Sequence, residues 1–144
     1  MSFTNLSNDK LLALVIYGEA RGEPTEGKQA VGEVILNRVR KGGWFGDTIA
    51  KVVLKPYQFS CFLPSDPNYR ILTGIAADWD NRYTHDIVLQ ACLKVATGLL
   101  AGSHTLLLPE GTCYYKVIGC PASWAAGMVK VATIGHQEFF KERA

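Results

Sequence analysis

One glutamate lies where its chemistry would differ from that of an ordinary surface carboxylate. Glu19 closely follows the apolar run Leu11 to Ile16 and precedes a turn that contains Gly22. If the run forms a helix, the negative end of the helix dipole disfavours an ionised carboxylate there, and partial burial acts in the same direction. A carboxylic acid that stays protonated near neutral pH is suited to protonating a glycosidic oxygen. The structural alternative is a surface ion pair of Glu19 with Arg21.

A second carboxylate is the usual partner of such an acid in glycoside hydrolysis. The chain has 13 acidic residues, and none of them is marked out as this partner. Glu23 follows Glu19 closely, but a turn separates the two, so the sequence does not predict their distance. The other candidates are Glu26 and Glu33, which we expect on a solvated helix face, and Asp66, Asp78 and Asp80, which could line a cleft.

The elements that must position Glu19 are mostly helical. Apolar spacing predicts a first helix over residues 9–18, capped by Ser7 or Asn8, and a second over residues 25–40. A short helix should follow a cap at Asp47 or Thr48 and stop before Pro56.

The second half of the chain is predicted to contain less regular structure. Residues 56–83 are rich in turn formers and are expected to be irregular. Asp86 should cap a long buried helix that ends near Gly102, and residues 112–118 have the composition of a strand. We expect residues 122–131 to be helical. The pattern therefore predicts one α+β domain over residues 1–144, mostly α, with a small β element beside a cleft.

Composition excludes several other classes of protein. Charged residues make up 19% of the chain and the net charge is +2, so no nucleic-acid-binding surface is indicated. The longest apolar run is too short to span a bilayer, and the first residues lack the pattern of a secretion signal. The scattered histidines and cysteines predict no zinc site, and the sequence implies no organic cofactor. The cysteines are expected to pack as small hydrophobes, although a disulfide between Cys113 and Cys120 remains open.

Several motifs in order resemble one known family. The chain reads YGEARGEP at residues 17–24, EGKQAV at 26–31, VILNRV at 34–39 and QFSC at 58–61, followed by WA at 124–125 and VATIG at 131–135. Together these blocks resemble the spore cortex-lytic, SleB-type cell-wall hydrolases, and they span nearly the whole chain. One such motif alone would be weak support, whereas the ordered set is specific.

The resemblance implies a lysozyme-like domain that cuts the β-1,4 bond between N-acetylmuramic acid and N-acetylglucosamine. The first Glu of the family's EARGE motif corresponds to Glu19, which is then the catalytic acid. Enzymes of this kind are usually lytic transglycosylases, in which the C6 hydroxyl of the muramic acid attacks C1 and leaves a 1,6-anhydro end. One carboxyl group can then act first as acid and afterwards as base. The alternatives are a muramidase that uses an activated water, and a peptidoglycan-binding module without activity.

Four further residues become candidates for substrate binding. Gln58 and Ser60 could hydrogen-bond sugar hydroxyls or acetamido groups, or else satisfy their own turn. Of the paired Tyr114 and Tyr115, only one can face the cleft on a strand, and we favour Tyr115. Thr112 precedes this pair and would be the residue to hold a water in the muramidase alternative.

The chain departs from the family pattern at two places. Relatives often carry His where this chain has Cys113. The family's ending resembles IGxHxFY, whereas this chain has His136 one position early, Gln137 in its place and Phe140 at the end. We therefore assign His136 no catalytic role.

The predicted biological setting is a bacteriophage endolysin, made in the host cytoplasm without a signal peptide and released to act on the periplasmic cell wall. The expected partner is the peptidoglycan glycan strand, with no nucleic acid and no membrane insertion, and the protein is expected to act as a monomer.

Overall fold

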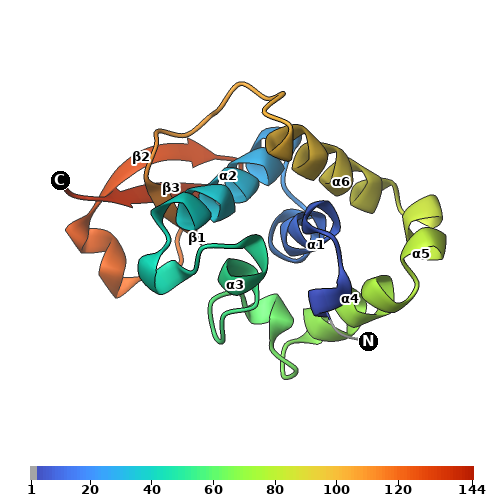
Figure 1. Ribbon diagram of the computed structural model, residues 1–144. Helices are drawn as coiled ribbons and strands as arrows, with labels where there is room; N and C mark the ends of the chain where they lie inside the picture. Colours follow the sequence, from blue (N-terminus) through green and yellow to red (C-terminus); the bar gives the residue numbers. More distant parts are fainter. Residues whose placement is uncertain (1–2) are drawn as a thin grey trace.

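A helix that is buried on all sides forms the centre of the fold. The computed structural model describes residues 3–144. Helix α1 (Asn8–Ala20) contains Leu11 to Ile16, and each of these six residues is at most 1% exposed. A helix that is apolar on every side belongs in the interior of a protein. Helices α2 (Thr25–Lys41), α3 (Ile49–Val53) and α6 (Ile87–Leu100) pack around α1, and Figure 1 shows α1 almost end-on between them.

Helix α2 (Thr25–Lys41) joins the helical core to the β-sheet through a row of buried polar side chains. Glu33 is 3% exposed and accepts hydrogen bonds from the backbone amides of Leu107 and Leu108. Gln29, one turn earlier, donates to Glu33, and Asn37, one turn later, donates to the carbonyl of Thr112. The expectation that Glu33 lies on a solvated face is therefore wrong, because this row attaches the segment that leads into the first strand.

The middle of the chain is more helical than the sequence indicated. Helices α4 (Pro67–Ala77) and α5 (Trp79–His85) occupy much of the segment predicted to be irregular. The turn formers that suggested a loop are instead a helix start: Asp66 caps α4 by accepting from the Asn68 amide, and Pro67 takes the first helical position. Leu72, Ile75 and Ala76, at helical spacing, bury the face of α4 that packs against the core.

The other two helices agree with the sequence. Helix α3 (Ile49–Val53) begins after Thr48, whose hydroxyl accepts from the amide of Lys51. Helix α6 (Ile87–Leu100) begins after Asp86, whose carboxylate accepts from the amides of Val88 and Leu89. These two predicted N-caps are confirmed because their side chains bond amides that a helix leaves unpaired. Ser7 occupies the N-cap position of α1, but its side chain makes no cap hydrogen bond.

The β element is a three-stranded antiparallel sheet in the order β1-β3-β2. Its strands are β1 (Thr112–Val117), β2 (Met128–Ile134) and β3 (Gln137–Glu142). The helix expected over residues 122–131 is wrong: a short 3-10 turn, Ser123–Gly127, is followed by β2. The valines at 129 and 131 alternate along β2 as β-branched residues do in strands, and pairing with β3 selects that conformation over a helix.

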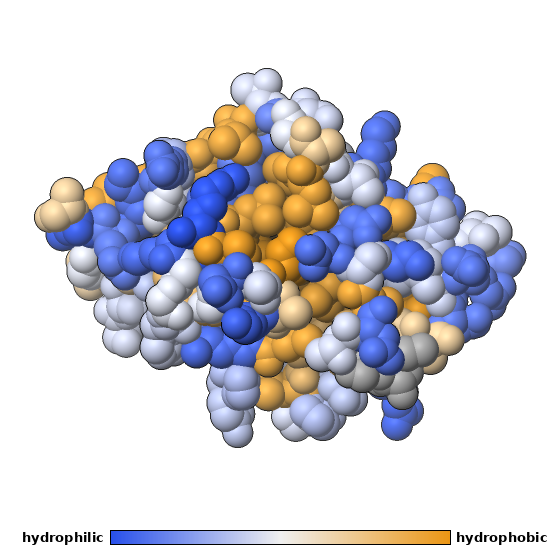
Figure 2. All heavy atoms as spheres, viewed as in Figure 1, coloured by the Kyte–Doolittle hydropathy of each residue, from blue (hydrophilic) through white to orange (hydrophobic). Residues whose placement is uncertain are grey.

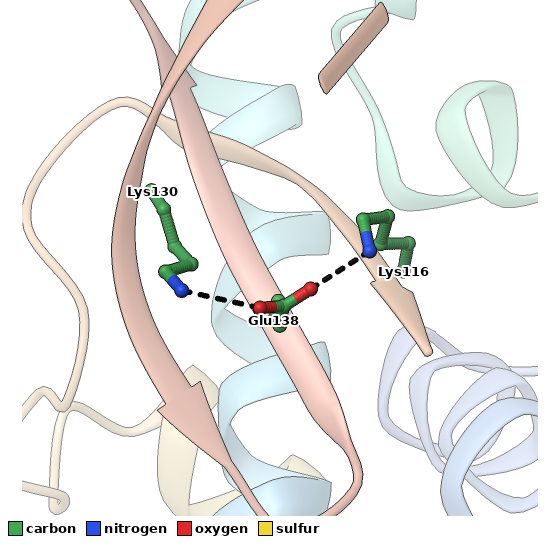
Figure 3. Close-up of polar contacts among 3 residues, drawn as sticks. All are labelled: Lys116, Lys130 and Glu138. Carbon is green, nitrogen blue, oxygen red and sulfur yellow. Dashed lines mark hydrogen bonds and ion pairs between the residues drawn. The ribbon is translucent and has the colours of Figure 1, made fainter. Parts of the chain in front are cut away.

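The two faces of the sheet differ in character. Tyr115 of β1 and the fully buried Phe139 of β3 are paired and lie on the face that packs on the helices. On the other face Glu138 of β3 accepts from Lys116 of β1 at 2.7 Å and from Lys130 of β2 at 3.2 Å. Figure 3 shows these side chains crossing all three strands, with α2 behind the sheet. The Lys116 and Glu138 side chains are mostly covered, whereas Lys130 is exposed, so the ion pair of Lys130 with Glu138 is worth little.

The whole is a single, mostly helical domain with a small sheet, as the sequence predicted. Figure 1 shows the sheet at one side of α2 and helices α4, α5 and α6 at the other side of the molecule. In the same view, Figure 2 shows a band of apolar side chains across the middle of the face, flanked by polar and charged ones. None of the helices within residues 3–144 has the length and apolarity needed to cross a bilayer.

Candidate active site

Glu19 lies in the last turn of α1, half-buried, with its carboxylate directed at the sheet. The hydroxyl of Tyr115 donates to Glu19 Oε1 at 2.5 Å, across a sequence separation of 96 residues. The thiol of Cys61 also hydrogen-bonds the carboxylate. Helix α1, strand β1 and the 3-10 turn Ser60–Phe62 therefore meet at this one side chain.

Gly18 allows this close meeting. A Cβ atom at position 18 would lie 2.7 Å from Cys61 Sγ and 3.2 Å from a methyl group of Leu72. Any larger residue would push the turn that carries Cys61 away from α1. The glycine beside Glu19 is thus required by the approach of the Cys61 thiol, and not by an unusual backbone angle.

The surroundings of Glu19 raise the pKa of its carboxyl group above the ordinary value. Burial is the largest cause, because it disfavours the charged form. Hydrogen bonds from Tyr115 and Cys61 and the positive charge of Arg38 lower the pKa, whereas the negative charge of Asp66 raises it further. The net effect favours a protonated acid, as the sequence argument anticipated.

Arg38 places a buried positive charge near the same carboxylate. Its Nε donates to the carbonyl of Cys113 at 2.8 Å, and its Nη1 contacts Gln58 Oε1 at 3.5 Å. The guanidinium also lies over the rings of Phe45, Phe59 and Tyr114. This packing holds β1 and the Gln58 turn against α2, and so fixes the two segments that supply Tyr115 and Cys61.

The surface ion pair that the sequence left open is not formed by Glu19 in the described part of the chain. Arg21 instead donates to Asn68 Oδ1 at 2.5 Å and to the Tyr17 carbonyl. Glu23 accepts from the backbone amide and the ring Nδ1 of His136 at 2.7 and 2.8 Å. Both neighbours of Glu19 therefore join distant elements and leave its carboxylate without a cationic partner in contact.

The predicted substrate-binding residues differ in their placement. Tyr115 contacts Glu19, and Gln58 is half-buried beside Arg38. Ser60 is exposed at the start of the turn that carries Cys61. Thr112 is fully buried, so its side chain does not face the solvent from which a water could reach Glu19, and its hydroxyl donates to the Pro109 carbonyl at 2.7 Å.

Tyr114 and Tyr115 lie on opposite faces of β1, as strand geometry requires. Tyr114 donates to Glu142 and packs against Trp124, away from Glu19. Burial raises the pKa of Tyr115 well above its ordinary value, and the charge of Glu19 acts in the same direction. Tyr115 therefore stays a protonated hydrogen-bond donor at any ordinary pH.

Among the candidate second carboxylates, Asp66 is the one whose charge acts on Glu19. One of its oxygens accepts from the Asn68 amide, and it lines a surface cavity of about 550 Å³ with Pro64, Ser65 and Tyr69. Asp78 and Asp80 are exposed near the start of α5.

Sequence reasoning missed two residues of the site. Arg38 lies within the VILNRV motif but was assigned no role, and Cys61 was expected to pack as a small hydrophobic residue. The QFSC motif contained a signal for Cys61, but nothing local indicated that its thiol faces a carboxylate. All four cysteines are free, and only Cys120 is exposed. Within residues 3–144, no cluster of three or more His, Cys, Asp or Glu side chains is arranged to hold a metal ion.

A sequence model of the cell wall hydrolases matches residues 22–140 of this chain. The chain belongs to the cell wall hydrolase family. This match begins after Glu19 and therefore does not include it. Two spore cortex-lytic enzymes are similar over shorter stretches: that of Oceanobacillus iheyensis is 49% identical over 51 residues, and that of Bacillus subtilis is 47% identical over 55 residues. These stretches cover 35% and 38% of this chain but only 18% of each relative.

Solved structures of the family share the fold over nearly the whole chain. The catalytic domain of the germination-specific lytic transglycosylase SleB from Bacillus anthracis superposes with a TM-score of 0.65 at 25% identity, covering 98% of this chain and all of that domain. The catalytic domain of Bacillus cereus SleB gives a TM-score of 0.58 at 27% identity, covering 93% of this chain and 89% of that one. The mostly helical architecture with a small sheet is therefore that of a SleB catalytic domain.

Proposed function

We propose that this cell wall hydrolase cleaves the β-1,4 bond between N-acetylmuramic acid and N-acetylglucosamine, with Glu19 as its acid and base. The observation that carries the proposal is the environment of Glu19: a half-buried carboxyl with a raised pKa, held by the Tyr115 hydroxyl at 2.5 Å. A raised pKa favours the protonated form, which is the form that can protonate a glycosidic oxygen.

In the proposed reaction the Glu19 carboxyl gives its proton to the glycosidic oxygen as the bond to C1 of the muramic acid breaks. The C1 centre develops positive charge, and the new Glu19 carboxylate is then positioned to take the proton of the muramic acid's C6 hydroxyl. That oxygen bonds to C1 and closes a 1,6-anhydro ring. The acid is regenerated and no water is consumed, so one carboxyl group is sufficient.

Tyr115 has a positioning role in this scheme. Its hydroxyl fixes one carboxylate oxygen of Glu19 and donates more strongly to the ionised form, which stabilises the carboxylate that remains after proton transfer. Gln58 and Ser60 belong to the turn that carries Cys61, and we propose that they hydrogen-bond the sugars. Thr112 is left out of the proposed site because it is fully buried.

A hydrolytic muramidase is the second candidate, and Asp66 is the observation that favours it. A carboxylate whose charge acts on Glu19, beside a solvent-accessible cavity, is placed to orient a water. The two candidates predict different products from the same site.

Mass spectrometry of the muropeptides released from purified peptidoglycan distinguishes the candidates. We expect products that end in 1,6-anhydromuramic acid, lighter by one water, and none of them from Glu19→Gln. Reducing muramic ends that disappear in Asp66→Asn would establish the muramidase instead. Binding without cleavage by the parent protein would favour the non-catalytic module.

We also propose that the enzyme serves in host lysis by a bacteriophage and reaches the wall only after the inner membrane is breached. Expression in a Gram-negative host should leave cells intact until the membrane is permeabilised, and lysis should then begin at once. The matched Glu19→Gln protein should not lyse the cells under either condition. Lysis by the parent protein without permeabilisation would contradict this role.

A further inference from the structure

The turn before Gln58 contains the one non-glycine residue in the described part of the chain that has a positive φ. Tyr57 has φ 66°. The amide of Gln58 donates to the carbonyl of Lys55 at 3.2 Å, so residues 55–58 form a β-turn with Pro56 second and Tyr57 third. Proline followed by a residue of positive φ is the pattern of a type II turn, in which the third position favours glycine or asparagine. A bulky aromatic residue in this conformation costs free energy.

The side chain of Tyr57 does nothing within the fold that offsets this cost. It is 82% exposed, more than any other large apolar or aromatic residue described. No hydrogen bond or ring contact to its side chain is found among residues 3–144. Tyr57 is thus strained although its side chain has no partner within the fold. Strained residues of this kind are typical of ligand-binding sites.

The position of the turn connects Tyr57 to the proposed active site. Gln58 contacts Arg38, and Cys61, four residues after Tyr57, hydrogen-bonds Glu19. On the other side of the turn, the ammonium group of Lys55 lies 4.4 Å from the ring centre of Trp44, which is 66% exposed. Trp44, Lys55 and Pro56 line a surface cavity of about 480 Å³. The turn that carries Tyr57 is thus in contact with the exposed Trp44 through Lys55 at one end, and at the other end it leads into the Gln58–Cys61 segment of the site.

We propose that Tyr57 is a substrate-binding residue whose ring stacks on a pyranose ring of the glycan strand, away from the bond that is cleaved. The flat C–H face of a sugar packs well on an aromatic ring, which buries apolar area without requiring that hydroxyl groups lose their hydrogen bonds. This inference rests on the proposed glycan cleavage and adds to it a contact that determines affinity for the strand.

The test combines stability with kinetics, because the two should change in opposite directions. Tyr57→Gly relieves the strained conformation, so its melting temperature should equal or exceed that of the parent. On glycan strands freed of their peptides, its KM should rise about fivefold to tenfold, the range for one lost aromatic contact, with a smaller change in kcat. Tyr57→Phe keeps the ring and should recover most of the lost affinity.

Ile87→Ala is the matched control, since Ile87 is 79% exposed at the start of α6 and contributes apolar surface of a similar kind. Its KM should match that of the parent. An unchanged KM in Tyr57→Gly, or an equal rise in Tyr57→Phe and Ile87→Ala, would overturn the inference while leaving Glu19 as the acid. Failure of the parent protein to cleave the strands would instead overturn the proposed function.

Discussion

Two glutamates, the half-buried Glu19 at the end of α1 and the buried Glu33 in the middle of α2, show how the surroundings of a carboxylate decide its role. Glu33 accepts hydrogen bonds from two backbone amides and from Gln29, so its oxygens are fully used in joining α2 to the segment before β1. Glu19 receives a tyrosine hydroxyl and a weakly donating thiol, and burial raises its pKa. A carboxylate with several amide donors is structural, whereas one with few donors remains available for proton transfer.

The largest expected effect is on catalysis at Glu19. Glu19→Gln keeps the shape and the hydrogen bond from Tyr115 but removes the acid, so kcat should fall about a hundredfold to ten-thousandfold. The rate at which each protein releases soluble fragments from purified peptidoglycan measures this loss. Lysis at the parent rate by the folded variant would remove Glu19 from the mechanism.

The same variant should also be more stable than the parent near neutral pH. The folded state raises the pKa of Glu19 above its ordinary value of 4.5, so the parent loses stability as the pH rises through and above that value. Gln does not titrate and has no such loss. Denaturant unfolding at pH 4 and pH 8 should show the variant's advantage only at the higher pH.

Glu33→Ala should affect stability and not the chemistry. The amides of Leu107 and Leu108 would lose their acceptor inside the protein, which costs about 2–4 kcal/mol of unfolding free energy. Urea unfolding measures the cost, and the pH dependence of kcat/KM for the protein that remains folded should match that of the parent. A variant as stable as the parent would mean that Glu33 does not anchor this segment.

Tyr115→Phe tests the donor that distinguishes the Glu19 site. The hydrogen bond lowers the pKa of Glu19, so its loss should raise that pKa further and move the basic limb of the kcat/KM profile to higher pH. Because the carboxylate also loses its positioning, the rate at the optimum should fall about tenfold or more. If Tyr115 had only a structural role, Tyr115→Phe would lower the stability of the protein but leave the pH dependence of kcat/KM unchanged.

The smallest expected effect is at Glu23, which joins the β2–β3 turn to the start of α2. Burial alone would raise the pKa of Glu23, but hydrogen bonds from the amide and ring of His136 outweigh it and lower the pKa below 4.5. The carboxylate therefore contributes stability that is lost as the pH falls through the lowered pKa. Glu23→Ala should cost about 0.5–1 kcal/mol at pH 7 and less at pH 3, as measured by urea unfolding.

The sequence by itself determined much of the helical half of the molecule. Leu11 to Ile16 are apolar on every side of a helix, Thr48 and Asp86 carry cap side chains, and each of these features depends on residues a few positions apart. The position of Glu19 at the end of an apolar helix, and the direction of its pKa shift, followed from the same local pattern.

The tertiary structure alone decided which side chains meet Glu19 and how the sheet forms. Tyr115 hydrogen-bonds the Glu19 carboxylate although the two residues are 96 positions apart in the sequence. The segment 122–134 contains strand β2 and not a helix because β2 pairs with β3. Asp66-Pro67 was expected in an irregular segment, but the burial of Leu72 and Ile75 against the core makes it the start of α4. Contacts between distant segments depend on how whole elements pack, and local propensity does not contain that information.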